Sequence, residues 1–158
     1  MTHRKTARDT QRRSDLNTLL MAYEMYYEKQ GTYSVENSGY PHAYGNYGYV
    51  NKTRSENLLY YDLSLVNGLI NAGYLSTAVR DPGASEGWVD YYVLYPIDST
   101  GPCLPPGCAG TMKSGICIYA KLEETPISDD DQSQWDALTN GSCQPRSPEF
   151  NYVVGHFK

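Results

Sequence analysis

The first third of the chain carries the clearest pattern, that of a long amphipathic helix. Leucine and tyrosine side chains recur there at steps of three, one, three, three and one, so they lie on one stripe of a helix. The stripe consists of Leu16, Leu19, Leu20, Tyr23, Tyr26 and Tyr27. Gly31 stands where a left-handed C-terminal cap belongs. We therefore predict a long helix over residues 7–30 that packs through this stripe, and we interpret residues 1–6 as an added tail.

A second, shorter helix is predicted over residues 56–73. Its apolar side consists of Leu65, Val66, Leu69 and Ile70. Gly73 is placed to end the helix, because glycine adopts the left-handed conformation of a C-terminal cap. The sequence leaves the start of the helix open, since Ser55, Asp62 and Ser64 all suit an N-cap.

A β pattern dominates residues 88–158. It follows a tight turn that the Asp-Pro-Gly sequence at 81–83 predicts. Three segments are rich in β-branched and aromatic residues, namely 89–95, 116–123 and 150–157. Alternation in the middle segment sends Ile116, Ile118, Ala120 and Leu122 to one face, and Cys117, Tyr119, Lys121 and Glu123 to the other. We therefore predict a single α+β domain of 158 residues, in which both helices pack against an antiparallel sheet of three or more strands.

Two irregular segments lie between these elements. Residues 34–54 are punctuated by glycine and carry Tyr40, Tyr44, Tyr47 and Tyr49. We interpret them as a loop packed over the surface by its tyrosines, with an exposed contact loop for a partner as the alternative. Sixteen tyrosines against two phenylalanines suit half-buried sheets and interfaces, and also suit a surface that stacks on sugars or bases. Residues 125–148 are polar and read as a solvated loop that contains Asp129, Asp130 and Asp131.

Charge is distributed unevenly along the chain. The formal net charge is −5, which argues against a dedicated nucleic-acid binder. Five of the 13 basic residues nevertheless fall in the first 13 positions: Arg4, Lys5, Arg8, Arg12 and Arg13. One interpretation is a solvated helix end, in which Asp9 pairs with Arg13 one turn later. The other is a contact in which Arg8, Arg12 and Arg13 meet anionic lipid head groups or acidic residues of a neighbouring copy.

The four cysteines favour disulfides over a metal site. Zinc prefers close Cys-x2-4-Cys pairs, usually two of them, and only Cys103 and Cys108 approach that spacing. Two disulfides indicate an oxidising compartment. Three pairings are possible, and we favour Cys103–Cys108 with Cys117–Cys143, the second of which ties the later loop across the outer face of the sheet.

The sequence carries no enzyme signature, so we expect a protein without catalytic activity. It lacks G-x-S-x-G, H-E-x-x-H and a glycine-rich phosphate loop. His3, His42 and His156 are not spaced to join a nucleophile or a metal. No apolar run approaches the roughly 20 residues that a membrane span requires.

Three motifs follow one another in a characteristic order. The first is RRSDLNTLLMAYEMYYEKQGTY at 12–33, which contains Asp15-Leu16 and Tyr26-Tyr27 and ends in Gly-x-Tyr. The second is LINAGYL at 69–75, followed by the Asp-Pro turn. The third combines Tyr91-Tyr92 with IYAKLE at 118–123. In this order, from Ala7 to about residue 124, they resemble the type IV pilin and pseudopilin family, and most of all the major pseudopilins of type II secretion.

The resemblance implies both a fold and a function. The fold is a pilin-like α/β roll, and the function is that of a structural subunit of a bacterial type IV pilus-like or type II secretion-like filament. Copies of the chain assemble through the N-terminal helix, while exposed loops serve adhesion, motility, DNA uptake or secretion. The implied partners are other copies of the chain, the inner-membrane assembly machinery and prepilin peptidase for the full-length form, and a surface, DNA or secreted-protein ligand. A leader and an apolar segment ahead of Ala7 are implied as well, with insertion in the inner membrane before assembly and an extracellular filament afterwards.

Two departures from the family qualify this expectation. The calcium-binding loop usual in major pseudopilins has no clear counterpart, and Asp129, Asp130 and Asp131 are only weak candidates, because adjacent acids rarely converge on one ion. No other cofactor is expected. The cysteines and the tyrosine-rich insertion favour a surface pilin over a secretion pseudopilin. The rival interpretation is a secreted ligand- or carbohydrate-binding module that uses the loop from Tyr40 to Tyr49 and forms no polymer.

Overall fold

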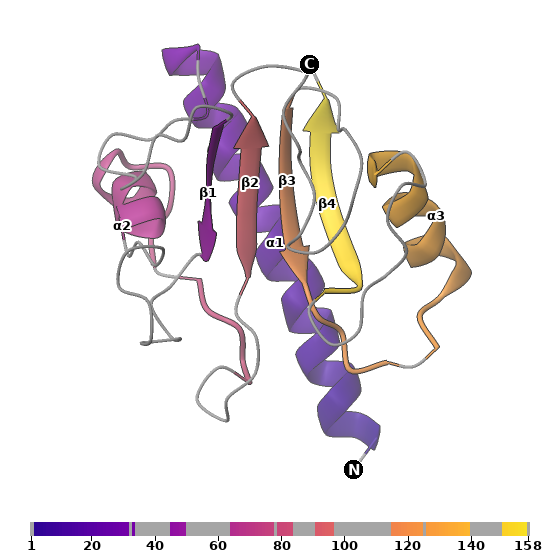
Figure 1. The fold of residues 1–158 in the computed structure, drawn as a ribbon. Helices are drawn as coiled ribbons and strands as arrows, with labels where there is room; N and C mark the ends of the chain where they lie inside the picture. Colours follow the sequence, from indigo (N-terminus) through magenta and orange to yellow (C-terminus); the bar gives the residue numbers. More distant parts are fainter. Residues whose placement is uncertain are drawn as a thin grey trace.

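The structure of the chain is a computed structural model. It describes residues 2–31, 33, 45–49, 64–77, 79–83, 91–96, 115–124, 126–139 and 150–157. The elements are α1 (Thr2–Gln30), β1 (Gly45–Tyr49), α2 (Ser64–Asn71), β2 (Tyr92–Pro96), β3 (Gly115–Ala120), α3 (Asp129–Thr139) and β4 (Tyr152–Phe157). A long helix crosses one face of an antiparallel sheet (Figure 1). The α+β prediction is therefore confirmed at this coarse level.

The sheet has four strands in the order β1-β2-β3-β4, each antiparallel to the next. Val93 of β2 stands opposite Ile118 of β3, and Ile118 stands opposite Val154 of β4. This register places one branched side chain from each of three strands in a row beneath α1. Helix α2 lies beside β1 and helix α3 beside β4, so the sheet is flanked at both edges (Figure 1).

Both predicted helix caps are present. Gly31 has a φ of 72°, and its N–H donates to the carbonyl of Tyr27 at 2.7 Å. Gly73 has a φ of 86°, and the N–H of Tyr74 reaches back to the carbonyl of Leu69 at 2.9 Å, as in a Schellman motif. The predicted start of the long helix at residue 7 is wrong. Helix α1 begins at Thr2 and includes most of the predicted tail. No proline or glycine occurs in that segment to stop the helix earlier.

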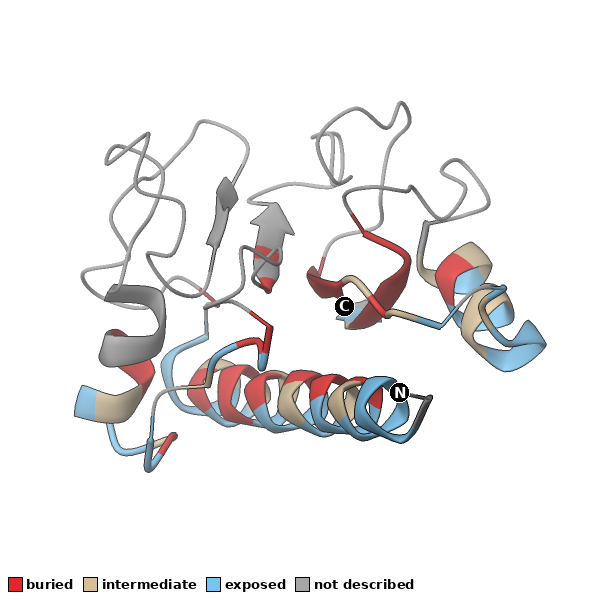
Figure 2. Ribbon diagram, turned by 90° about the horizontal axis from the view of Figure 1, so that it is seen from below, coloured by how far each residue is buried: buried red, intermediate tan, exposed pale blue. Residues whose placement is uncertain are grey.

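The predicted stripe of α1 packs against the sheet. Leu16 and Leu19 are fully buried, Tyr23 and Tyr26 are nearly so, and Leu20 and Tyr27 are partly buried against the same cluster. The sheet contributes the face predicted for the middle strand, Ile116, Ile118, Ala120 and Leu122. Buried residues follow the side of α1 turned towards the sheet, and exposed residues follow the opposite side (Figure 2).

The opposite face of the sheet holds a second, smaller core. Tyr119 packs against Trp135 of α3 and against Phe150, with ring centroids 5.9 Å and 5.8 Å apart. Cys117 is buried on the same face of β3 as Tyr119, as its alternation predicted. Gly155 lies opposite Cys117, and a Cβ there would stand 2.5 Å from the carbonyl oxygen of Ile116. Glycine therefore allows the two strands to approach over this core.

The acidic segment was predicted as a solvated loop, and this prediction is wrong for residues 129–139. Asp129, Asp130 and Asp131 form the first turn of α3, where negative charge favours the positive end of the helix dipole. The hydroxyl of Ser128 accepts a bond from the N–H of Asp131 at 3.2 Å and caps the helix. The three carboxylates therefore have a structural role at a helix start.

Two further boundaries differ from the sequence prediction. Residues 45–49 form strand β1, so this part of the tyrosine-rich loop is regular sheet that carries Tyr47 and Tyr49. The middle strand ends at Ala120 instead of Glu123. Beyond that point the side chain of Asn151 takes over the pairing, since it accepts from the N–H of Leu122 at 2.6 Å and donates to the carbonyl of Leu122 at 3.1 Å.

Several predictions lie outside the described residues. They concern the start of the second helix before Ser64 and the tyrosines at 40 and 44. They also concern the two disulfides, because the structure describes only Cys117 among the four cysteines Cys103, Cys108, Cys117 and Cys143. Both pairings therefore stay predictions.

Because one side of α1 is buried and the other exposed, alanine substitutions along the helix should change the free energy of unfolding unequally. Leu19→Ala removes a fully buried side chain, so we expect it to lower the free energy of unfolding by about 2–5 kcal/mol. Met21→Ala, two residues on, removes an exposed side chain and should change it by less than about 0.5 kcal/mol. Urea unfolding measures both variants, and equal losses would contradict the packing described here.

Candidate functional site

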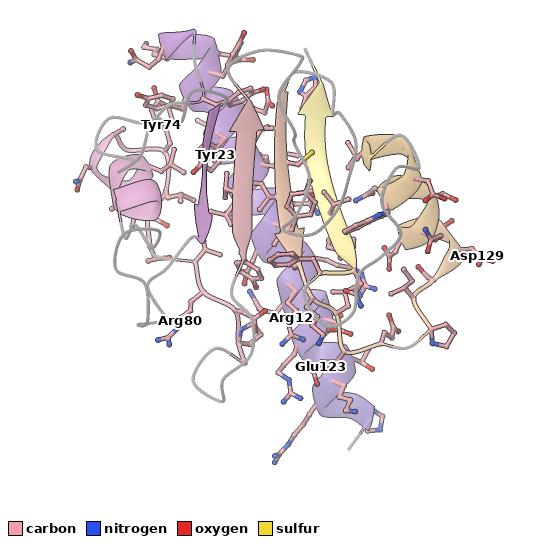
Figure 3. The ribbon with its side chains drawn as sticks, viewed as in Figure 1. Arg12, Tyr23, Tyr74, Arg80, Glu123 and Asp129 are labelled. Carbon is pink, nitrogen blue, oxygen red and sulfur yellow. The ribbon has the colours of Figure 1, made fainter. Side chains whose placement is uncertain are left out.

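The N-terminal half of α1 is held by a buried arginine. Arg12 is 0 % exposed, and its guanidinium reaches three carboxylates from three separate segments of the chain. Its Nε and Nη2 donate to Asp81 at 2.8 Å and 3.0 Å, and its Nη1 donates to Asp9 and to Glu123, both at 2.8 Å. Arg12 and Glu123 lie together where α1 passes the end of the sheet (Figure 3). We call Asp9, Arg12, Asp81 and Glu123 the arginine hub.

Backbone groups complete the hub. The Asp9 carboxylate accepts from the N–H of Glu123 at 2.9 Å and 3.1 Å and from the N–H of Glu124 at 3.0 Å. The Asp81 carboxylate accepts from the N–H of Gly83 at 2.7 Å, which closes the predicted Asp-Pro-Gly turn. Each buried carboxylate is therefore bound on both sides, as a charge removed from water requires. The hub joins α1 to the turn at 81–83 and to the segment after β3.

Two neighbouring arginines extend these contacts towards the surface. Arg8 makes a two-pronged pair with Glu123, with both N–O distances at 2.6 Å. Arg13 donates to Glu124 at 3.0 Å and to Asp131 of α3 at 2.9 Å, and its guanidinium lies 5.7 Å from the ring centre of Tyr152. These pairs are partly exposed, so water and salt screen them and each adds little to the free energy of unfolding.

The hub shifts the pKa values of Glu123 and Arg12. Hydrogen bonds from Arg8 lower the pKa of Glu123 from 4.5 to about 2; burial opposes this shift, and the hydrogen bond from Arg12 adds to it. Burial alone would lower the pKa of Arg12, but the bonds to Asp81, Glu123 and Asp9 outweigh burial and raise it above its ordinary value. Glu123 and Arg12 are therefore charged near neutral pH.

This arrangement corrects the sequence interpretation of the basic cluster. Arg12 was predicted to face solvent, lipid head groups or another copy, and it is fully buried instead. Arg8 and Arg13 are paired with carboxylates of their own chain. Asp9 pairs with Arg12 at i+3, and the expected pair with Arg13 at i+4 is not the one formed. Glu123 was predicted on the outer face, but the strand ends at Ala120 and the chain turns back to α1.

Further along α1, two carboxylates bind tyrosine hydroxyls. Tyr91, at the start of β2, donates to Asp15 at 2.6 Å, and Tyr33 donates to Glu24 at 2.6 Å. Burial, followed by the bond to the carboxylate, raises the pKa of both tyrosines far above the ordinary value. His156 of β4 stands 3.2 Å from the same Glu24 oxygen. His156 therefore belongs to a contact between β4 and α1, a role the sequence did not suggest.

The side of α1 that faces solvent and the side that faces the sheet differ in charge. Every charged residue between Ala7 and Met25 bonds to another part of the chain, as the contacts of Arg8, Asp9, Arg12, Arg13, Asp15 and Glu24 show. The exposed positions over the same span are Ala7, Thr10, Gln11, Ser14, Asn17, Thr18, Met21 and Met25. None of these side chains is charged. We call these eight residues the neutral face.

The neutral face combines polar side chains that carry no charge with two methionines. Solvent-exposed helix faces normally carry charged and polar residues, with the apolar stripe turned inward. Among the described residues, the large hydrophobic side chains that stand exposed are Met21, at 66 %, and Met25, at 50 %. They occupy adjacent turns of the neutral face, because they are four residues apart.

The described part of the structure contains no metal-binding cluster and no membrane-spanning helix. Within the ranges that it covers, no group of three or more histidine, cysteine, aspartate or glutamate side chains is arranged to hold a metal ion. In the same ranges, no helix has both the length and the apolar character needed to cross a membrane. Comparison of the chain with models of protein families, with curated proteins and with solved structures found no match in any of the three.

Replacing the central arginine tests the hub. Arg12→Met keeps most of the aliphatic volume and leaves buried carboxylates without their main countercharge, so we expect a loss of about 3–5 kcal/mol in the free energy of unfolding. Arg4→Met, on an exposed turn of the same helix, should change it by less than about 0.5 kcal/mol. Adding Asp81→Asn to Arg12→Met should recover part of the loss. An Arg12→Met protein as stable as the wild type in urea would contradict the hub.

The lowered pKa of Glu123 predicts acid sensitivity. A carboxylate whose pKa falls on folding stabilises the protein above its unfolded pKa, and this stability is lost as the pH falls through the folded value. For Glu123 the window runs from about 4.5 down to about 2. Above this window the wild type should be more stable than Glu123→Gln, and the difference should shrink steadily within it. Urea unfolding at a series of pH values measures this difference, and a constant gap would rule the linkage out.

Proposed function

We propose that the protein is a non-enzymatic structural subunit of a type IV pilus-like or pseudopilus-like filament and that its copies assemble through α1. The observation that carries the proposal is the neutral face. A chain with a net charge of −5 repels its own copies, and a neighbouring copy approaches with least repulsion where the surface presents no charge. The partner that best fits this face is therefore another copy of the chain.

The way the chain folds supports the same proposal. Motifs that carry the family resemblance lie far apart in the sequence and contact one another in space. Asp81 of the Asp-Pro turn binds Arg12, and Tyr91 of the Tyr-Tyr pair binds Asp15. These contacts turn the charged side chains of α1 inward and hold the helix against the sheet, which supports the proposed pilin-like roll.

Assembly of such subunits requires a heterologous contact. When one surface of a copy meets a different surface of the next, and the rotation does not close, the result is an open helical filament. In this proposal the helices bundle at the centre, the sheets form the outside, and the ligand-binding loops remain outermost. The full-length form passes through the inner membrane with the assembly machinery and prepilin peptidase, and the finished filament is extracellular.

Adding charge to the neutral face tests the proposal. The full chain is tethered to lipid vesicles by a tag at its N-terminus, which raises the local concentration of copies, and is then chemically cross-linked. The wild type should give a ladder of dimers, trimers and larger products. Ser14→Glu with Thr18→Glu adds two negative charges to the neutral face and should reduce the ladder about tenfold, because these charges are repelled by the net negative charge of the next copy.

The matched control is Ser133→Glu with Ala137→Glu, which adds the same charge at the same spacing on exposed positions of α3. This variant should keep the ladder. Products that stop at the dimer would indicate a closed two-fold contact and contradict a filament. A ladder that both variants lower equally would show that net charge, and not the neutral face, governs association.

A further inference from the structure

Met21 and Met25 give the neutral face a property that its other residues lack. Their thioether side chains are the exposed large hydrophobic groups among the residues that the structure describes, and they stand one turn apart. Methionine is flexible and polarisable, so it fills irregular gaps and forms adaptable contacts between surfaces. Under the proposed function, these two side chains are the apolar centre of the contact between copies.

The same two side chains are open to chemical modification. Hydrogen peroxide transfers one oxygen atom to a thioether sulfur: the sulfur lone pair forms the S–O bond, the O–O bond breaks, and water leaves. The sulfur is oxidised by two electrons and the peroxide is reduced by two. The product, methionine sulfoxide, is polar and can be reduced back to methionine by methionine sulfoxide reductases: a thiol co-reductant supplies the two electrons and becomes a disulfide, and the oxygen leaves as water. Exposure governs access, and Met21 and Met25 are 66 % and 50 % exposed.

We propose that Met21 and Met25 form an oxidation-sensitive contact, so that peroxide weakens assembly through α1 and sulfoxide reduction restores it. The physical reason is desolvation. Two apolar groups that lose contact with water favour association, whereas two sulfoxides must give up hydrogen bonds to water when a second copy covers them. This inference rests on the proposed function, since it concerns the same face and the same partner.

The fold itself should tolerate the modification. Leu16, Leu19 and Tyr23 pack on the inward side of α1, whereas Met21 and Met25 project from the outward side. Oxidation of the two methionines therefore leaves the helix–sheet core intact. A change in assembly without a change in unfolding is the signature that separates a contact residue from a structural one.

The experiment treats the tethered full chain with hydrogen peroxide, maps the sulfoxides by peptide mass spectrometry and repeats the cross-linking. Once Met21 and Met25 are converted, we expect the ladder to weaken about tenfold or more, while the urea midpoint stays unchanged. Treatment with both sulfoxide reductases should restore the ladder. In Met21→Leu with Met25→Leu, the ladder before and after peroxide should be the same, whatever its absolute strength, because leucine cannot be oxidised in this way.

The outcomes separate this inference from the proposed function. A ladder that persists after Met21 and Met25 are fully converted overturns the inference and leaves the filament proposal standing. A peroxide effect of equal size in the double leucine variant also overturns it, since the four methionines include two others and the chain has four cysteines. The absence of any ladder from the untreated wild type overturns the proposed function, and the inference fails with it.

Discussion

The fold depends on one buried guanidinium. Arg12 is the point at which α1, the turn at 81–83 and the segment after β3 meet. A buried ion pair adds little net stability, because desolvation offsets most of the attraction. A buried ion pair nevertheless requires a defined geometry, because a misplaced partner leaves an unpaired charge in the protein interior, where water cannot solvate it. The arginine hub therefore acts mainly to fix the register of α1 on the sheet.

The two halves of α1 are held by different forces. Ion pairs hold the half that contains Asp9 and Arg12, whereas leucine and tyrosine packing holds the half from Leu16 to Tyr26. The first depends on pH and the second on burial of apolar area. Together, the ion pairs and the apolar packing turn the charged side chains and the leucine and tyrosine side chains of these segments towards the sheet. The neutral face follows from this, because the charges that would normally solvate the helix are already bound inside the molecule.

The sequence predicted the hydrophobic half of this arrangement and missed the polar half. Periodicity located the stripe from Leu16 to Tyr27, and glycine located both helix ends, because apolar spacing and positive φ are properties of a few residues in series. The signal for the hub was also present. Extending the stripe backwards from Leu16 at steps of four and three reaches Arg12 and Asp9, but charged residues on a helix are by default assigned to solvent. The carboxylates of Asp81 and Glu123 lie 69 and 111 residues away from Arg12, so no local pattern links them.

The remaining errors have the same origin. Helix α3 was read as a loop because its first turn consists of three aspartates, although a serine cap and the helix dipole favour that composition at a helix start. Glu123 was assigned by alternation to the outer face, and alternation fails where Asn151 replaces the ladder and the chain bends. In each case a side chain bonded to the backbone, that of Ser128 or Asn151, outweighed the general pattern.

Native-state hydrogen exchange tests the hub most directly. The N–H groups of Glu123 and Glu124 lie beyond the end of β3. Amides in such a segment normally exchange rapidly, because the segment opens locally at a low cost in free energy. Because both donate to the buried carboxylate of Asp9, the account predicts protection comparable to that of the β3 amides. Exchange of these two amides as fast as that of an open loop would contradict it, and the inward orientation of the charges on α1 would lose its explanation.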